Sequence, residues 1–179
     1  GAPAPGVRDR ALWLLLPALG SLALLAFTSH VCQNVAVIPF LWVIPLALYL
    51  LTFILAFERE GAYRRGPVAA ATLVLLVLTT LYSDPNSDRA DLAFWKALAL
   101  FMLTLFALCL LCHGELVRIK PGVRRLTTFY LLISAGGAAG GLFVGLVAPR
   151  IFTGFFELHV GLFLCAALMV VALLRDRTF

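Results

Sequence analysis

Charged residues are scarce in this sequence. Only 13% of its 179 residues are charged, whereas 63% are hydrophobic, and the mean hydropathy is +1.03. A soluble domain has about 25% charged residues, so this chain lacks the polar side chains that would cover a folded surface in water. The composition excludes an ordinary soluble domain and predicts an integral membrane protein whose solvent is the lipid bilayer.

The chain also lacks the motifs of several functional classes. It contains no H-E-x-x-H motif and no Ser/His/Asp set that would indicate membrane hydrolysis. Its four cysteines lie mostly in apolar runs, where free Cys acts as a small hydrophobe, so no disulfide framework is expected. The net charge of +5 comes from basic residues in short loops, which indicates topology and not nucleic-acid binding. We predict no catalytic residue, metal or cofactor in this chain.

Apolar segments of helical length make up most of the chain. A spanning helix needs roughly 20 residues, and no segment alternates polar and apolar residues as a barrel strand does. Six segments qualify: 11–28, 39–57, 67–82, 92–112, 126–147 and 155–174. The sequence therefore predicts an all-α bundle of about six transmembrane helices over 11–174, with a linker-like start (1–10) and a short end (175–179). Pro17 and Pro45 lie inside the first two segments, where each is expected to free a backbone carbonyl.

Basic residues are distributed unevenly between the two sides of this bundle. All of the 14 Lys and Arg fall on one side except Arg89, Lys96 and Arg150. The positive-inside rule makes the richer side cytoplasmic, and an even number of spans places both termini there. This predicts a multi-pass membrane protein with both termini in the cytoplasm.

The fifth segment, FYLLISAGGAAGGLFVGLVAP, has two rows of glycine at a spacing of four residues. One row is Gly137, Gly141 and Gly145, and the other is Gly136 and Gly140. Small residues at this spacing let another helix approach closely. Because a nucleotide-binding loop would need a preceding strand, the glycines predict tight helix packing.

Two polar clusters are candidate binding sites. The external cluster combines the end of the first helix with the start of the sixth, and its members are His30, Cys32, Gln33, Asn34, Glu157 and His159. His and Cys suit a transition metal, and two His suit a haem. The simpler interpretation is a hydrated loop with polar helix ends.

The internal cluster follows the fourth segment and consists of His113, Glu115, Arg118, Lys120, Arg124 and Arg125. Glu115 is spaced to pair with Arg118 or with a basic residue of another loop, and the cluster suits an anion, a lipid headgroup or a docked cytosolic domain. The simpler interpretation is that these charges only set topology. Cys109, Cys112 and His113 also match C-x-x-C-H, the motif for c-type haem attachment. The predicted cytoplasmic location disfavours haem attachment, and so few ligands disfavour a metal site.

Three stretches carry a family resemblance: HVCQNVAVIPFLWVIPLALYLLTFILAF (30–57), CHGELVRIKP (112–121) and LTTFYLLISAGGAAGGLFVGLVAP (126–149). In this order they resemble the later half of the membrane region of bacterial fused major-facilitator/spermidine-synthase proteins. The resemblance implies a multi-pass membrane region in a bacterial inner membrane, followed by a cytosolic aminopropyltransferase-like domain. In the first stretch Cys32, Gln33 and Asn34 replace Thr-Thr-Asp-like residues, so a carboxylate is missing from the external turn.

These features favour a membrane scaffold or anchor that packs with other membrane helices, with further subunits or with such a cytosolic domain. Interhelical hydrogen bonds are expected from polar groups within the segments, which are Tyr49, Thr52, Thr104, Tyr130 and Ser134. One alternative is half of a pathway for a small solute, although no Asp, Glu, Lys or Arg lies deep in a segment. A second alternative is a redox or haem subunit that uses His30 and His159.

Overall fold

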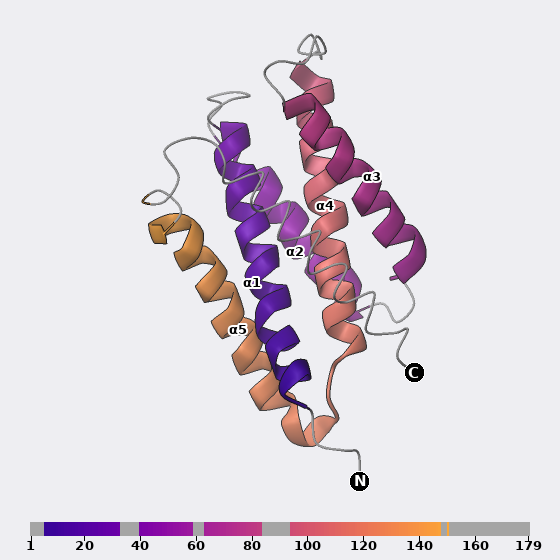
Figure 1. Ribbon diagram of the computed structural model, residues 1–179, viewed down its shortest axis with the longest axis vertical. Helices are drawn as coiled ribbons and strands as arrows, with labels where there is room; N and C mark the ends of the chain where they lie inside the picture. The colour runs from indigo at the N-terminus through magenta and orange to yellow at the C-terminus, as the bar shows by residue number, and fades with distance from the viewer. Residues whose placement is uncertain (1–5, 33–39, 59–62, 84–93, 148–149, 151–179) are drawn as a thin grey trace.

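The computed structural model describes residues 6–32, 40–58, 63–83, 94–147 and 150 of the chain (Figure 1). These residues form helices and contain no strand, in agreement with the predicted all-α class. The α-helices are α1 (Val7–His30), α2 (Val43–Glu58), α3 (Arg65–Ser83), α4 (Phe94–Arg118) and α5 (Leu126–Leu142). A 3₁₀ turn, η2 (Val123–Arg125), precedes α5, and a π turn, η3 (Phe143–Val147), follows it. The predicted sixth helix at 155–174 lies outside the described residues.

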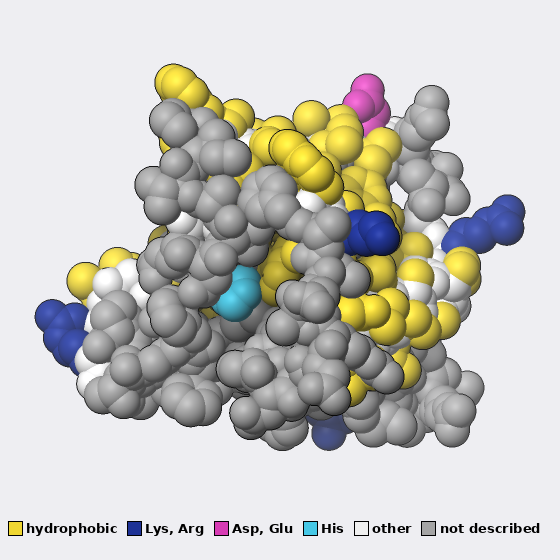
Figure 2. All heavy atoms as spheres, turned by 90° about the horizontal axis from the view of Figure 1, so that it is seen from above, with side chains coloured by type: hydrophobic (Ala, Val, Ile, Leu, Met, Phe, Trp, Pro, Cys, Tyr) yellow, Lys and Arg dark blue, Asp and Glu magenta, His cyan; other side chains and the backbone are white. Residues whose placement is uncertain are grey.

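The helix α4 lies at the centre of the bundle and packs against α1, α2 and α3, while α5 packs along α1 (Figure 1). Successive helices run in alternating directions, so α1, α3 and α5 begin at the end of the bundle where α2 and α4 finish. We call this the basic end because it carries Arg8, Arg10, Arg64, Arg65, Arg118, Lys120, Arg124 and Arg125. The described side chains seen from the opposite end are mainly hydrophobic (Figure 2), and the described Lys and Arg at that end are Lys96 and Arg150.

Four of the helical segments are long and apolar enough to cross a membrane: Val7–His30, Arg65–Tyr82, Trp95–Arg118 and Val123–Val147. The α2 helix is apolar but shorter, with 16 residues. The outward faces of these helices expose large hydrophobic side chains, among them Leu50, Ile54, Val74, Val77 and Leu131. Such surfaces suit lipid and would be unfavourable in water.

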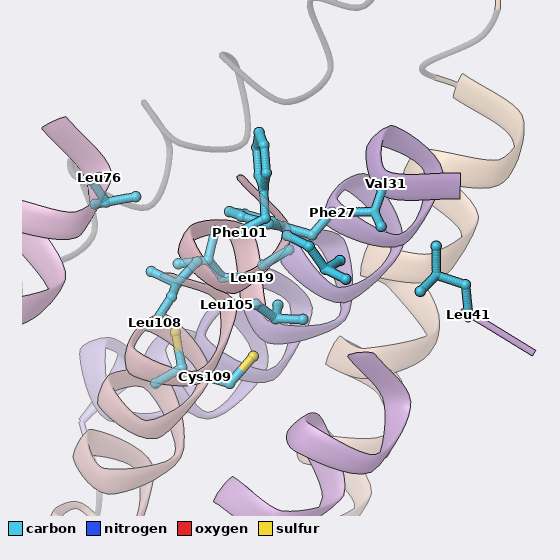
Figure 3. Close-up of a cluster of buried hydrophobic side chains, with 12 residues drawn as sticks. Leu19, Phe27, Val31, Leu41, Leu76, Phe101, Leu105, Leu108 and Cys109 are labelled. Atoms are coloured by element: carbon cyan, nitrogen blue, oxygen red, sulfur yellow. The ribbon is translucent and has the colours of Figure 1, made fainter. Parts of the chain in front are cut away.

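The main hydrophobic core lies between α1 and α4 (Figure 3). Phe27 of α1 meets Phe101 of α4 edge-on, with ring centroids 6.1 Å apart. Leu105 and Cys109 of α4 are fully buried beside them. Cys109 therefore packs as a small apolar side chain in this core.

The contact between α1 and α5 brings the two backbones together at glycine. A Cβ on Gly136 would lie 2.1 Å from the Leu14 carbonyl oxygen, and one on Gly140 would lie 2.1 Å from that of Ala18. Neither oxygen belongs to a movable side chain, so only glycine permits this approach. The expected packing role holds most strongly for this second glycine row.

The other glycine row contributes less to the contact. A Cβ on Gly137 would lie 3.3 Å from Ser21 Oγ, and one on Gly141 would lie 3.8 Å from Leu25. At Gly145 the same test meets no described atom within 4 Å. Gly145 lies in the π turn η3, and no close contact is seen at this glycine among the described residues, so its packing role stays a prediction.

The helix ends differ from the predicted ones in three places. α1 begins at Val7, inside the expected linker, because the Asp9 carboxylate accepts the Gly6 N–H at 3.1 Å and closes the first turn. Pro45 lies in the first turn of α2, where the N–H it lacks would have no helical partner. The Leu41 carbonyl accepts the Ile44 N–H instead, so Pro45 does not leave this carbonyl free as expected.

The third difference concerns α4, which continues past the predicted end at Cys112 to Arg118. The residues that seemed to leave the membrane are instead the last two turns of a helix. The Ile119 N–H still bonds the Glu115 carbonyl, and the Lys120 N–H bonds that of Val117. Polar residues here stay helical because neighbouring segments supply their partners.

Replacing Gly140 by Ala is expected to separate α1 from α5. The added Cβ would overlap the Ala18 carbonyl, and overpacking of this kind costs about 1–3 kcal/mol. Thermal unfolding in detergent, followed by circular dichroism, would measure the loss. Gly141→Ala is the matched control, since its Cβ meets only an ordinary contact at 3.8 Å; equal losses in both variants would contradict the proposed contact.

Candidate functional site

The last two turns of α4 hold three consecutive buried residues, His113, Gly114 and Glu115, which we call the His-Gly-Glu segment. His113 is 1% exposed and Glu115 is 7% exposed. Consecutive helical residues point in different directions. Each residue of the segment therefore meets a different neighbour.

His113 points between α1 and α2. Its Nδ1 lies 3.1 Å from the Thr52 hydroxyl of α2. The rings of Tyr49 and Phe53 meet the imidazole edge-on, with centroids 4.9 Å and 5.1 Å away. On the α1 side, a Cβ on Gly20 would lie 3.6 Å from His113 Nε2, an ordinary van der Waals distance, so the ring packs closely against this part of α1.

The hydrogen bonds of the Thr52 hydroxyl assign the tautomer of His113. The Thr52 hydroxyl has one hydrogen and donates it to the Tyr49 carbonyl at 2.7 Å. It therefore accepts from His113, which places the proton of the neutral imidazole on Nδ1. Nε2 is then an unprotonated nitrogen, and it is buried without a hydrogen-bond partner among the described residues. The opposite tautomer would bury an unsatisfied N–H and lose the Thr52–Tyr49 bond.

Gly114 supports the ring of Tyr63, which precedes α3. A Cβ on Gly114 would lie 2.3 Å from the Tyr63 ring, so the ring rests directly on the α4 backbone. From this position the Tyr63 hydroxyl donates to Glu115 Oε1 at 2.7 Å. Burial and this hydrogen bond to a carboxylate raise the pKa of Tyr63 above its ordinary value.

Glu115 joins α4 to the start of α3. Its Oε1 lies 3.1 Å from Arg65 Nε and 3.3 Å from Arg118 Nη1, in addition to the Tyr63 hydroxyl. The sequence suggested a pair with Arg118 or with another loop, and the structure has both. Two Arg around one carboxylate leave one positive charge in excess, so the cluster is compensated and remains basic.

A second polar contact crosses the bundle between α3 and α4, where the hydroxyls of Thr79 and Thr104 lie 2.8 Å apart. Each hydroxyl also lies within bonding distance of a carbonyl of its own helix, Leu75 or Leu100. The two hydroxyls carry two hydrogens, but three hydrogen bonds are within reach: one to each carbonyl and one between the hydroxyls. One threonine therefore donates to the other threonine instead of to the carbonyl of its own helix. This hydrogen bond can join the helices because neither group meets water.

The other predicted site residues are dispersed or lie outside the described residues. Asn34, Glu157 and His159 are outside them, so the expected meeting of His30 with His159 is not described. His30 ends α1, and its ring lies 4.8 Å from that of Phe101. Cys32 is half-buried. At the basic end Lys120 and Arg124 are exposed, and Arg125 is half-buried.

The C-x-x-C-H motif does not form a metal site in the described part of the chain. Cys109 and Cys112 are buried in the apolar core, whereas His113 points to Thr52 and Gly20. Among the described residues no group of three His, Cys, Asp or Glu is placed to hold a metal ion. The motif arises from two core residues followed by a separate polar contact.

Sequence reasoning missed the partners that complete the site. Tyr63 and Arg65 lie before and at the start of α3, about 50 positions ahead of Glu115 in the chain, and nothing in their local pattern indicates Glu115. Gly20 is a lone glycine in α1 and belongs to no repeated row. The useful signal was the polar character of Thr52 and Glu115, because a polar group in a span requires a partner.

Thr52→Val is expected to remove the acceptor of His113 and leave its Nδ1–H unsatisfied in the core. Such a loss costs about 1–3 kcal/mol, measurable as a lower midpoint of thermal unfolding in detergent. Thr52→Ser should keep most of the stability because it retains the hydroxyl. Thr80→Val, which loses only an exposed bond to the Val77 carbonyl, should change little; similar losses at Thr80 and Thr52 would refute the role given to Thr52.

Glu115→Gln is expected to destabilise the bundle by about 3 kcal/mol, the low end for removing one partner of a buried ion pair. The low end applies because the Arg118 side chain is 43% exposed and can reach water. Unfolding should start near the α3–α4 contact, where hydrogen exchange at Arg65–Thr72 would increase. Glu58→Gln changes an exposed carboxylate and serves as the control; unchanged exchange in Glu115→Gln would show that the cluster does not hold α3.

Comparison of the chain with protein-family models, with curated proteins and with solved structures finds no match. The geometry of the described residues is therefore the basis for the functional argument.

Proposed function

We propose that the chain is a membrane scaffold or anchor module, built as a transmembrane bundle with its basic end toward the cytoplasm. The observation that carries the proposal is the backbone contact of α1 and α5 at Gly136 and Gly140. Helices in this contact are poorly suited to moving apart during a transport cycle, because any shift removes the fit between glycine and carbonyl.

The electrostatics of the described spans support the same function. Glu115, which is the buried carboxylate among the described residues, lies in the last turn of α4 and is compensated by Arg65 and Arg118. Coupled ion transport usually depends on ionisable groups that face a pathway inside the membrane. A compensated group at the helix end instead fastens α3 to α4, as a rigid anchor requires.

The sequence resemblance extends the proposal to a cytosolic partner. It implies an aminopropyltransferase-like domain after the membrane region, in a bacterial inner membrane. The basic end agrees with a cytoplasmic location by the positive-inside rule. In this proposal the bundle holds the partner at the membrane and performs no reaction itself.

One observation favours the alternative of a solute pathway. His113 Nε2 is buried without a hydrogen-bond partner among the described residues, and His within spans often serves in proton relays. The tautomer assignment makes this nitrogen a ready acceptor. Its position against Gly20, inside close contacts of α1 and α2, agrees better with a packed core residue.

Reporter fusions after Phe179 test the orientation on which the anchor depends. A green fluorescent protein fused there should fluoresce in bacteria, because this protein becomes fluorescent only in the cytoplasm. Alkaline phosphatase at the same position should be inactive, because this enzyme becomes active only in the periplasm. The reverse pattern would contradict a cytoplasmic anchor. Uptake of labelled spermidine by proteoliposomes that contain the chain, with loss of uptake in His113→Ala, would replace the anchor with the transport alternative.

A further inference from the structure

Two valines at the basic end are unusually exposed. Val7, the first residue of α1, is 85% exposed, and Val123, the first residue of η2, is 86% exposed. Arginines follow each valine closely: Arg8 and Arg10 after Val7, Arg124 and Arg125 after Val123. Both sites therefore present an apolar tip beside cationic side chains, a combination typical of the membrane interface.

The two sites belong to one surface. The Trp13 indole N–H of α1 donates to the Ile119 carbonyl, in the connection that leads to η2, at 3.0 Å. The Trp13 ring also meets Phe129 of α5 edge-on, with centroids 5.3 Å apart. These contacts fix the start of α1 beside the connection and α5, which lie together at the basic end in Figure 1. We call Val7, Arg8, Arg10, Val123, Arg124 and Arg125 the Val-Arg face.

The acidic groups nearby leave this face positive. The Asp9 carboxylate is held at the start of α1 by the Gly6 N–H. Glu115 is buried below the surface between Arg65 and Arg118. The exposed carboxylate at this end, among the described residues, is Glu58 at the end of α2, next to Phe57, which packs against the Trp13 cluster. The four arginines of the face outnumber Asp9 and Glu58, so the face stays positive.

Helix length sets the depth of the face in a bilayer. α1 has 24 residues, which gives about 36 Å at about 1.5 Å per residue. The hydrocarbon core is about 30 Å thick, so the outer turns of α1 reach the headgroup layer. Val7 and its arginines lie in such a turn, and the Trp13 contacts hold Val123 beside it.

We propose that the Val-Arg face binds the phosphate headgroups of anionic phospholipids in the leaflet at the basic end, with the two valines inserted at the boundary of headgroup and acyl chain. Cationic side chains at this depth attract anionic lipid, and exposed valine gains by leaving water. An acidic protein domain would use the charges but would not need valines at this depth. The inference is independent of the anchor function, because it concerns lipid selectivity.

Native mass spectrometry of the full chain in detergent tests the proposal, with phosphatidylglycerol and phosphatidylcholine added in equal amounts. The wild type should retain phosphatidylglycerol preferentially. Each arginine near an anionic surface contributes about 1 kcal/mol, which corresponds to about fivefold in binding. Arg124→Gln/Arg125→Gln should therefore reduce the preference by more than tenfold, and Arg8→Gln/Arg10→Gln should reduce it similarly.

Matched controls separate a specific face from total charge. Lys96→Gln/Arg150→Gln removes the same charge from exposed residues of α4 and the segment after η3, away from the basic end, and should leave the preference unchanged. Val7→Ser/Val123→Ser alters only exposed side chains and should weaken retention of both lipids. Added inorganic phosphate should not displace phosphatidylglycerol, which distinguishes a lipid site from a free-anion site.

The proposal would be overturned by equal retention of the two lipids by the wild type, by an equal loss in the Lys96→Gln/Arg150→Gln control, or by displacement by phosphate alone. A preference that survives loss of all four arginines would also overturn it, because the lipid would then bind elsewhere. Unfolding midpoints of each variant, measured in the same detergent, show whether a loss of lipid follows from loss of the fold.

Discussion

The interior of this bundle depends on hydrogen bonds between helices, because a polar side chain in the bilayer core finds no water to bond. Thr52 of α2 therefore accepts from His113 of α4, and the hydroxyls of Thr79 and Thr104 join α3 to α4. All these contacts involve α4. Its central position in the fold follows from the polar groups it carries, which must be completed by its neighbours.

Packing without a hydrophobic driving force imposes the second constraint. Lipid chains are as apolar as leucine, so helices associate only where they fit closely. α1 meets this requirement twice with different chemistry. It presents carbonyls to the glycines of α5 on one side, and a core of Leu19, Ala23 and Phe27 to α4 on the other. These two contacts make α1 the element that connects α5 to the rest of the bundle.

Charge is concentrated where the spans end, and it has two functions there. Glu115, Arg65 and Arg118 pair below the surface and fasten α3 to α4. Arg8, Arg10 and Arg124 stay exposed at the start of α1 and in η2, two segments that the Trp13 contacts hold side by side. The basic end therefore combines the ion pairs that hold α3 against α4 with an exposed cationic surface. Both features would serve the membrane anchor that we propose.

Much of this architecture was predictable from local sequence, and the exceptions have clear physical causes. Hydrophobic runs predicted the helices over α1–α5, because their length and apolar character suffice for a span. The end of α4 was predicted at Cys112, six residues too early, because the polar residues His113 and Glu115 indicated the end of a membrane span. They remain helical because Thr52, Tyr63 and Arg65 complete them, and those partners come from distant parts of the chain.

The sequence by itself determined the solvent, the helical class and the uneven distribution of charge, since each depends on composition and on spacing along one segment. Only the tertiary structure decided which glycine row packs, which proton His113 carries and which groups surround Glu115. These depend on what neighbouring helices place opposite each residue. C-x-x-C-H shows the difference, because its letters resemble a haem motif while the fold buries two cysteines in a core and turns the histidine toward Thr52.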